Sequence, residues 1–162
     1  MNYTYFSELE NNTLNKSEIE SEQAFMERIL TAVFHEKTEE MDGRINDKLK
    51  PVFAACDAAQ RSLSVSFQAE EWMLNPNGTL HGGMLSTCVD IVMSVLSRFL
   101  ARKRAMFTAQ LSMNFLRTIQ RGDTFTVQVT ADHVGRRSVI VHAHVCVGDS
   151  EKYAATATAV LM

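Results

Sequence analysis

The stretch Asn75–Leu100, NPNGTLHGGMLSTCVDIVMSVLSRFL, decides the fold of this chain. It opens with Pro76, Asn77 and Gly78, which favour a turn, and Thr79 stands where a helix cap is expected. A long apolar run follows, in which hydrophobic side chains recur at helical spacing. The sequence therefore predicts one long helix that is buried on most of its sides.

A single polar arc interrupts this apolar helix. At about 100° per residue, the arc collects small polar side chains around one carboxylate: Ser86, Thr87, Asp90, Ser94 and Ser97. An ionised carboxylate among apolar side chains costs on the order of several kcal/mol unless it is solvated or partnered. Asp90 is therefore either a solvent-facing residue or part of a functional site, where perturbed carboxylates gather.

Gly82 and Gly83 stand in the first turn of the helix. Each costs about 1 kcal/mol of helix propensity relative to alanine. A helix N-terminus carries free backbone N–H groups and a partial positive charge, and glycine lets another group approach them. The glycines therefore either relieve packing or leave these donors open to a ligand.

The spacing between Gly82 and Asp90 constrains any joint role. Eight residues apart on one helix, they lie about 12 Å apart along the axis, so one small reacting group cannot touch both. Two such helices running antiparallel across a two-fold axis would bring Asp90 of one subunit to Gly82 of the other. A catalytic interpretation therefore predicts a homodimer with two equivalent sites.

Three motifs carry a resemblance to a known family. Asn75, His81-Gly82-Gly83 and Asp90, at these spacings, resemble the active-site signature of hotdog-fold acyl-CoA thioesterases of the phenylacetic-acid-pathway (PaaI-like) branch. The segment Thr108–Arg117, TAQLSMNFLR, is similar to the family strand that begins with Ser or Thr and ends in Asn-Phe-Leu-Arg. Gly135-Arg136-Arg137 is the third match.

The resemblance covers about Cys56 to Met162 and implies an α+β hotdog fold, a curved antiparallel sheet wrapped around one long helix. The sequence pattern agrees, because runs with strand character flank the helical stretch. The predicted strands are Val52–Ala59, Leu63–Ala69, Ala105–Leu116, Asp123–Val134, Ser138–Val147 and Lys152–Leu161. We place the hotdog domain at residues 51–162.

Residues 1–50 form a predicted N-terminal helical extension outside the resemblance. Ser17 with Glu20 fits a capping box, and a break is expected at Asp42-Gly43. The apolar stripe consists of Ile19, Met26, Ile29, Leu30, Val33 and Phe34, with Met41, Ile45 and Leu49 continuing it. Such a stripe packs on its own domain or on a sister subunit. Its acidic polar face argues against a membrane-surface role.

The resemblance implies the chemistry of the site. The Gly82 N–H would polarise the thioester carbonyl and stabilise the oxyanion. Asp90 would act as general base toward water or as nucleophile through a mixed anhydride, and the sequence leaves both open. Asn75 and Thr108 would orient the carboxylate or its water. Without the resemblance, Asn75 would be interpreted as a turn residue and Thr108 as an ordinary strand residue. His81 would steady the loop and helix start rather than carry protons.

The chain departs from the family pattern at two positions. Thr118 replaces the usual proline after Arg117, which leaves the exit of the strand less constrained. Met93 stands three residues after Asp90, where a small residue is common, and could reshape the acyl pocket. Phenylacetyl-like and medium-chain fatty acyl groups therefore both remain open.

Charge is uneven along the chain. Residues 1–50 hold 11 acidic and 6 basic side chains, net −5, and the remainder holds 8 acidic and 10 basic, net +2. Arg102, Arg104, Arg136 and Arg137 are candidates for contacts with the phosphates of coenzyme A, or are solvated charges in loops and at a helix end. An acidic chain without a basic stripe argues against nucleic-acid binding.

Cys56, Cys88 and Cys146 are odd in number and lack pairing or metal spacing, which predicts reduced thiols in a cytoplasmic protein without a metal. His142 and His144 share one strand face without a third ligand. The chain start does not resemble a secretory signal, and charged residues interrupt every apolar run long enough to span a membrane.

The function predicted from these observations is hydrolysis of acyl-CoA by a homo-oligomer, a dimer at minimum and a dimer of dimers by preference. Coenzyme A belongs to the substrate, so no separate cofactor is expected. The alternative is a non-catalytic hotdog module that binds an acyl thioester as a sensor or assembly partner. A hotdog dehydratase fits less well, because no histidine is placed for that chemistry.

Overall fold

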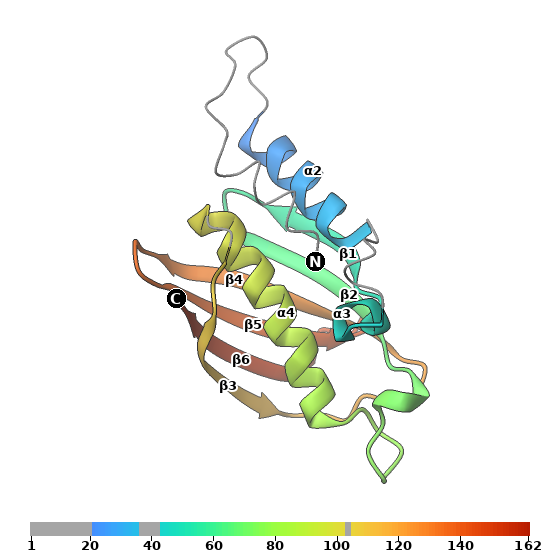
Figure 1. Cartoon of the computed structure of the whole chain (residues 1–162). Helices are drawn as coiled ribbons and strands as arrows, with labels where there is room; N and C mark the ends of the chain where they lie inside the picture. Colours follow the sequence, from blue (N-terminus) through green and yellow to red (C-terminus); the bar gives the residue numbers. More distant parts are fainter. Residues whose placement is uncertain (1–20, 36–42, 103–104) are drawn as a thin grey trace.

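The computed structural model describes residues 21–35, 43–102 and 105–162 (Figure 1). The predicted capping box at Ser17, the stripe residues Ile19 and Met41, and Arg104 lie outside the described residues.

One antiparallel sheet forms the frame of the molecule. Its strands are β1 (Val52–Asp57), β2 (Ser62–Gln68), β3 (Thr108–Phe115), β4 (Thr124–Val134), β5 (Val139–Val147) and β6 (Tyr153–Leu161). The order across the sheet is β1-β2-β4-β5-β6-β3, and every neighbouring pair is antiparallel. The predicted strands are confirmed, and no end differs from its predicted position by more than three residues.

The helix α4 (Gly82–Ala101) lies across the concave face of this sheet (Figure 1). On β2 the side chains of Leu63, Val65 and Phe67 are buried, while the serines between them are half-buried. Such alternation gives a sheet with one face on the core and one toward solvent. The prediction of a sheet wrapped around one long helix is confirmed.

Helix α4 is long and apolar enough to cross a membrane by length and composition, with a mean hydropathy of 1.6. Of its most apolar 18-residue window, 61% is buried inside the fold. Its own side chains Val89, Val92 and Leu96 are fully buried in the core. Its apolar character is therefore that of a core helix.

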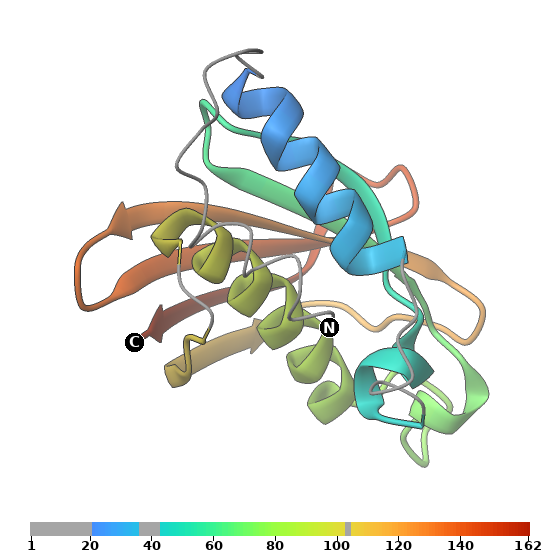
Figure 2. The ribbon, with the colours of Figure 1, turned by 45° about the horizontal axis from the view of Figure 1, so that its top comes forward.

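The helix α2 (Glu22–His35) packs along β1 (Figure 2). Its buried side chains are Phe25, Met26, Ile29, Leu30 and Val33, and they join the same hydrophobic core as the sheet and α4. The ring of Phe25 lies 5.9 Å from that of Phe99 on α4. The Gln23 amide also ties α2 to the sheet, because its Nε2 donates to the Cys56 carbonyl on β1 at 2.9 Å. The predicted stripe therefore packs on its own sheet.

A short helix, α3 (Ile45–Leu49), follows α2 after the break predicted near Gly43. Leu49 is buried, as its place in the predicted stripe requires, whereas Ile45 is 42% exposed. The stripe therefore continues into α3 at Leu49 alone. The separation of residues 1–50 from the hotdog domain stays a prediction.

Candidate active site

Helix α4 begins at a histidine cap rather than at the predicted cap Thr79. His81 is the N-cap residue, with extended backbone angles, and its Nδ1 accepts a hydrogen bond from the Gly83 N–H at 2.9 Å. Thr79 instead forms an isolated β-bridge with Gln120. The prediction for Thr79 is wrong, because the loop pairs with the segment before β4 and so delays the helix by two residues. The His81 ring caps the start of α4, and its role in the reaction stays a prediction.

The two glycines after this cap have different neighbours. A Cβ on Gly83 would lie 3.1 Å from His81 Nδ1, so a side chain there would crowd the cap. A Cβ on Gly82 would lie 3.3 Å from Cζ of Phe115 on β3. No described residue accepts a hydrogen bond from the Gly82 N–H. A free donor thus lies at the positive end of α4, beside an aromatic ring.

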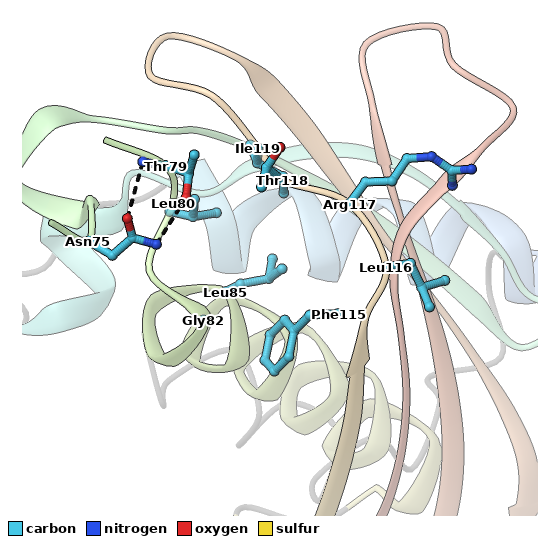
Figure 3. Close-up of a pocket in the computed structure, with 10 residues that line it drawn as sticks. All are labelled: Asn75, Thr79, Leu80, Gly82, Leu85, Phe115, Leu116, Arg117, Thr118 and Ile119. Carbon is cyan, nitrogen blue, oxygen red and sulfur yellow. Dashed lines mark hydrogen bonds between the residues drawn. The ribbon is translucent and has the colours of Figure 1, made fainter. Parts of the chain in front are cut away.

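Asn75 holds the loop that leads into this helix. Its Oδ1 accepts from the N–H groups of Asn77 and Thr79, at 2.9 and 3.3 Å, and its Nδ2 donates to Thr79 Oγ1 at 2.9 Å. These bonds stay within the loop, as expected of a turn residue. Figure 3 shows the same amide at the edge of the pocket that reaches Gly82.

That pocket has a volume of about 320 Å³ and lies between the loop, the start of α4 and the end of β3. Its wall is mainly apolar, with polar groups at its edge (Figure 3). The lining residues are Asn75, Thr79, Leu80, Gly82, Leu85, Phe115, Leu116, Arg117, Thr118 and Ile119. An apolar cavity with a few convergent polar groups is typical of a small-molecule site. Met93 does not line it, since its side chain is wholly buried in the core.

A second group of predicted residues meets farther along α4. Thr108 Oγ1 donates a hydrogen bond to Asp90 Oδ1 at 2.6 Å. The Asp90 side chain is half-buried, and no described residue donates to its Oδ2. Asp90 therefore keeps one carboxylate oxygen fixed by a hydroxyl and one oxygen available.

The five predicted catalytic residues thus form two groups rather than one. Asn75, His81 and Gly82 gather at the start of α4, and Asp90 and Thr108 meet two turns later. The axial separation of Gly82 and Asp90 is about 12 Å. Within one chain, the carboxylate and the free amide do not share a single reacting group.

Strand β3 connects the two groups, because Thr108 stands at its first position and Phe115 at its last. It is an edge strand that pairs with β6, and its other edge pairs with no described strand. Large apolar side chains are exposed along it and beside it: Phe107 is 75% exposed, Phe115 55% and Leu116 54%. An unpaired edge with exposed apolar side chains is a typical association surface.

The described arginines that were predicted to contact phosphate lie far from the start of α4. Arg102 is the C-cap of the 20-residue helix α4, about 30 Å from Gly82. Arg136 and Arg137 follow the 11-residue strand β4, which starts beside the pocket and runs away from it for about 35 Å. Within one chain these arginines therefore lie far from Gly82.

One cation at the pocket was missed. Arg117 lines the cavity that reaches Gly82, and its Nη1 donates to the Tyr153 carbonyl at 2.7 Å. The signal that could have found it was its place two residues after Phe115, at the end of the family-like Asn-Phe-Leu-Arg run.

Two cysteines and two strand histidines take no part in the contacts of this site. Burial raises the pKa of the Cys88 thiol to about 12, and burial with nearby Glu27 raises the pKa of Cys56 to about 11. These thiols stay protonated at neutral pH and are poor nucleophiles. His142 Nδ1 lies 2.8 Å from Asp132 Oδ1, and His144 stacks on Tyr153 at 4.2 Å. Over the described ranges, no three His, Cys, Asp or Glu side chains form a group that could hold a metal ion.

The sequence and the fold of this chain are similar to those of known proteins. The family model described as Thioesterase superfamily matches residues 77–154. The Pseudomonas aeruginosa protein PA0474, classed as an esterase by prediction, is 33% identical over 104 residues, which is 64% of this chain and 77% of that protein.

Two solved structures are also similar. One is a phenylacetic acid degradation-related protein of Ralstonia eutropha, classed by prediction as a thioesterase. It is 26% identical, has a TM-score of 0.67, and the match covers 81% of this chain and 96% of that one. The other is smu.793 of Streptococcus mutans bound to acetyl CoA. It is 23% identical, has a TM-score of 0.60, and the match covers 68% of this chain and 85% of that one.

Proposed function

Because this chain belongs to the thioesterase superfamily and is a thioester hydrolase with the hotdog fold, we propose that it hydrolyses acyl-CoA to a free acid and coenzyme A. The observation that carries the proposal is the Gly82 N–H, a free donor at the positive end of α4 that opens beside an apolar pocket. The similarity to a structure with acetyl CoA bound supports the choice of substrate.

In this proposal the thioester carbonyl binds at Gly82. Its oxygen accepts a hydrogen bond from the Gly82 N–H, and the helix end stabilises the negative charge that develops on it. Removing a donor of this kind typically lowers the rate about 10²–10³-fold. The ring of Phe115 lies against Gly82 and forms one wall beside the bound carbonyl.

Asp90 supplies the second half of the chemistry. As general base, its free Oδ2 takes a proton from water while the water oxygen attacks the carbonyl carbon, and coenzyme A leaves as the thiol. As nucleophile, Oδ2 attacks the carbonyl carbon, the C–S bond breaks and coenzyme A leaves as the thiolate; water then hydrolyses the mixed anhydride, which releases the acid and restores Asp90. Thr108 serves either route, because its hydroxyl fixes Oδ1 and thereby aims Oδ2.

The other predicted residues position these groups. His81 uses its Nδ1 to cap α4, so the ring holds the Gly82–Gly83 backbone in place and is not the proton carrier. Asn75 keeps the preceding loop closed through Thr79, which fixes the edge of the pocket. Its amide retains one further N–H that a bound water or carbonyl could accept.

The proposal requires a second copy of the chain. A two-fold axis beside the free edge of β3 would place Asp90 and Thr108 of one protomer against Gly82 and Phe115 of its partner, and would cover the exposed apolar side chains of this edge. We therefore propose a homodimer with two shared sites, which could pair further into a dimer of dimers.

The test is thiol release from a panel of acyl-CoA esters, including phenylacetyl and medium-chain fatty acyl groups, by wild type and Asp90→Asn. We expect the variant to fold and assemble like wild type and to lose at least about a hundredfold in turnover. Asp132→Asn is the matched control, because Asp132 is an exposed carboxylate that contacts His142.

Two results would oppose the proposal. Equal turnover by wild type and Asp90→Asn would remove Asp90 from the mechanism. A folded wild type that binds acyl-CoA but releases no thiol from any ester would favour the non-catalytic module.

A further inference from the structure

Arg117 occupies a particular place at the pocket. It follows β3 two residues after Phe115 and lines the same cavity as Gly82 and Asn75. Figure 3 shows its side chain running away from Gly82, toward the start of β6. Its guanidinium group therefore lies away from the proposed carbonyl site.

The side chain is held in this position by β6. The Arg117 backbone N–H donates to the Ala154 carbonyl at 3.0 Å, and its Nη1 donates to the Tyr153 carbonyl at 2.7 Å. A guanidinium has five N–H donors in a fixed fork, so most of them stay available. Arg117 is also exposed, and a ligand can reach it.

The charge of Arg117 is not compensated by a described acid. No ion pair joins Arg117 to a described carboxylate, whereas Arg121, four residues further along the chain, is paired with Glu71 at 2.6 Å. An exposed guanidinium that is held in place beside a cavity, without an acidic partner among the described residues, can bind an anion. Its planar set of N–H donors matches the oxygens of a phosphate.

We propose that Arg117 binds a phosphate of the coenzyme A moiety, an inference that rests on the proposed acyl-CoA activity. The thioester and the phosphates of coenzyme A are separated by a long neutral arm. Such an arm suits a site in which Gly82 and Arg117 line one mainly apolar cavity and the Arg117 side chain runs away from Gly82 (Figure 3). Phosphate binding from the same protomer is thereby assigned to Arg117, since Arg102, Arg136 and Arg137 lie at the far end.

The test compares two substrates that carry the same neutral acyl group, one on coenzyme A and one on pantetheine, which lacks the phosphates. Arg117→Ala is expected to raise KM for the acyl-CoA by about 10–100-fold, the effect of losing a hydrogen bond to a charged group. The kcat for acyl-CoA and both constants for acyl-pantetheine should stay within about threefold of wild type. Arg117→Lys should recover part of the acyl-CoA affinity, because it keeps the charge but loses the fork.

Arg121→Ala is the matched control, since Arg121 is an exposed arginine four residues away that is paired with Glu71. It should leave both substrates within about threefold of wild type, as is usual for an exposed ion pair. Equal losses on both substrates in Arg117→Ala would overturn the proposal and make the residue structural.

A further experiment distinguishes a phosphate of coenzyme A from a carboxylate on the acyl group as the anion that Arg117 binds. If Arg117→Ala slows hydrolysis only of substrates whose acyl group ends in a carboxylate, Arg117 binds the acyl group and the phosphate proposal is overturned. If wild type hydrolyses neither substrate, the proposed function fails, and calorimetric binding of free coenzyme A then tests Arg117 separately. Weaker binding by Arg117→Ala than by wild type would support the inference, and equal binding would overturn it.

Discussion

At the scale of single residues, the first turn of α4 holds two glycines for two different reasons. Gly83 leaves room for the His81 ring that caps the helix, and Gly82 lets the backbone lie against Phe115. The cost of glycine in a helix indicates from sequence that some neighbour requires the space. The identity of each neighbour depends on contacts that only folding establishes, since Phe115 is on a strand beyond the helix.

The histidine cap leads to a prediction that separates positioning from proton transfer. His81→Asn should keep turnover within about threefold and keep the melting temperature, because Asn is among the best N-cap residues. His81→Ala should lose about 1 kcal/mol of stability. Thermal denaturation and thiol release on the same samples check both expectations. Loss of at least a hundredfold in turnover by a stable His81→Asn would show that the imidazole itself takes part in the reaction.

At the scale of elements, β3 shows how far a local pattern can be followed. Its sequence predicts a strand, and the strand is present with its start moved from Ala105 to Thr108. Its place at the sheet edge next to β6, beyond strands that follow it in the chain, is not encoded in its own pattern. That place decides that Thr108 reaches Asp90 and that Phe115 reaches Gly82.

Helix α2 provides the stability prediction. Leu30 is fully buried in the core shared with the sheet, so Leu30→Ala should destabilise the whole protein by about 2–5 kcal/mol. Chemical denaturation should show a single transition that moves to lower denaturant. The exposed Glu27, changed to Gln, is the control and should shift stability by no more than about 0.5 kcal/mol.

A different outcome would bear on the domain division at residue 50. If Leu30→Ala produces a separate transition at low denaturant and leaves the midpoint of the main transition unchanged, the N-terminal extension unfolds independently of the hotdog domain. The contact between the rings of Phe25 and Phe99 argues for one cooperative unit.

At the scale of the whole molecule, the site is expected to be completed by assembly. One chain holds an amide-bearing pocket and, about 12 Å along the helix, a carboxylate aimed by Thr108. A mixed dimer of differently tagged Asp90→Asn and Gly82→Val chains should therefore have about half of wild-type activity, because one of its two sites receives both intact residues. Tandem affinity purification followed by thiol release measures this activity.

Each homodimer of a single variant serves as the control and should be nearly inactive. A purified mixed dimer as inactive as its parents would mean that each chain carries its own complete site, and the shared-site proposal would fail.

The sequence by itself determined the central helix, the six strands and the residues worth testing, because these follow from periodicity, turn chemistry and a motif of fixed spacing. It placed the helix cap at Thr79 instead of His81 and missed Arg117. Only the tertiary structure decided which distant residues meet, such as Thr108 with Asp90 and Phe115 with Gly82. The physical reason is that local patterns fix an element and its buried face, whereas its neighbours depend on how all elements pack together.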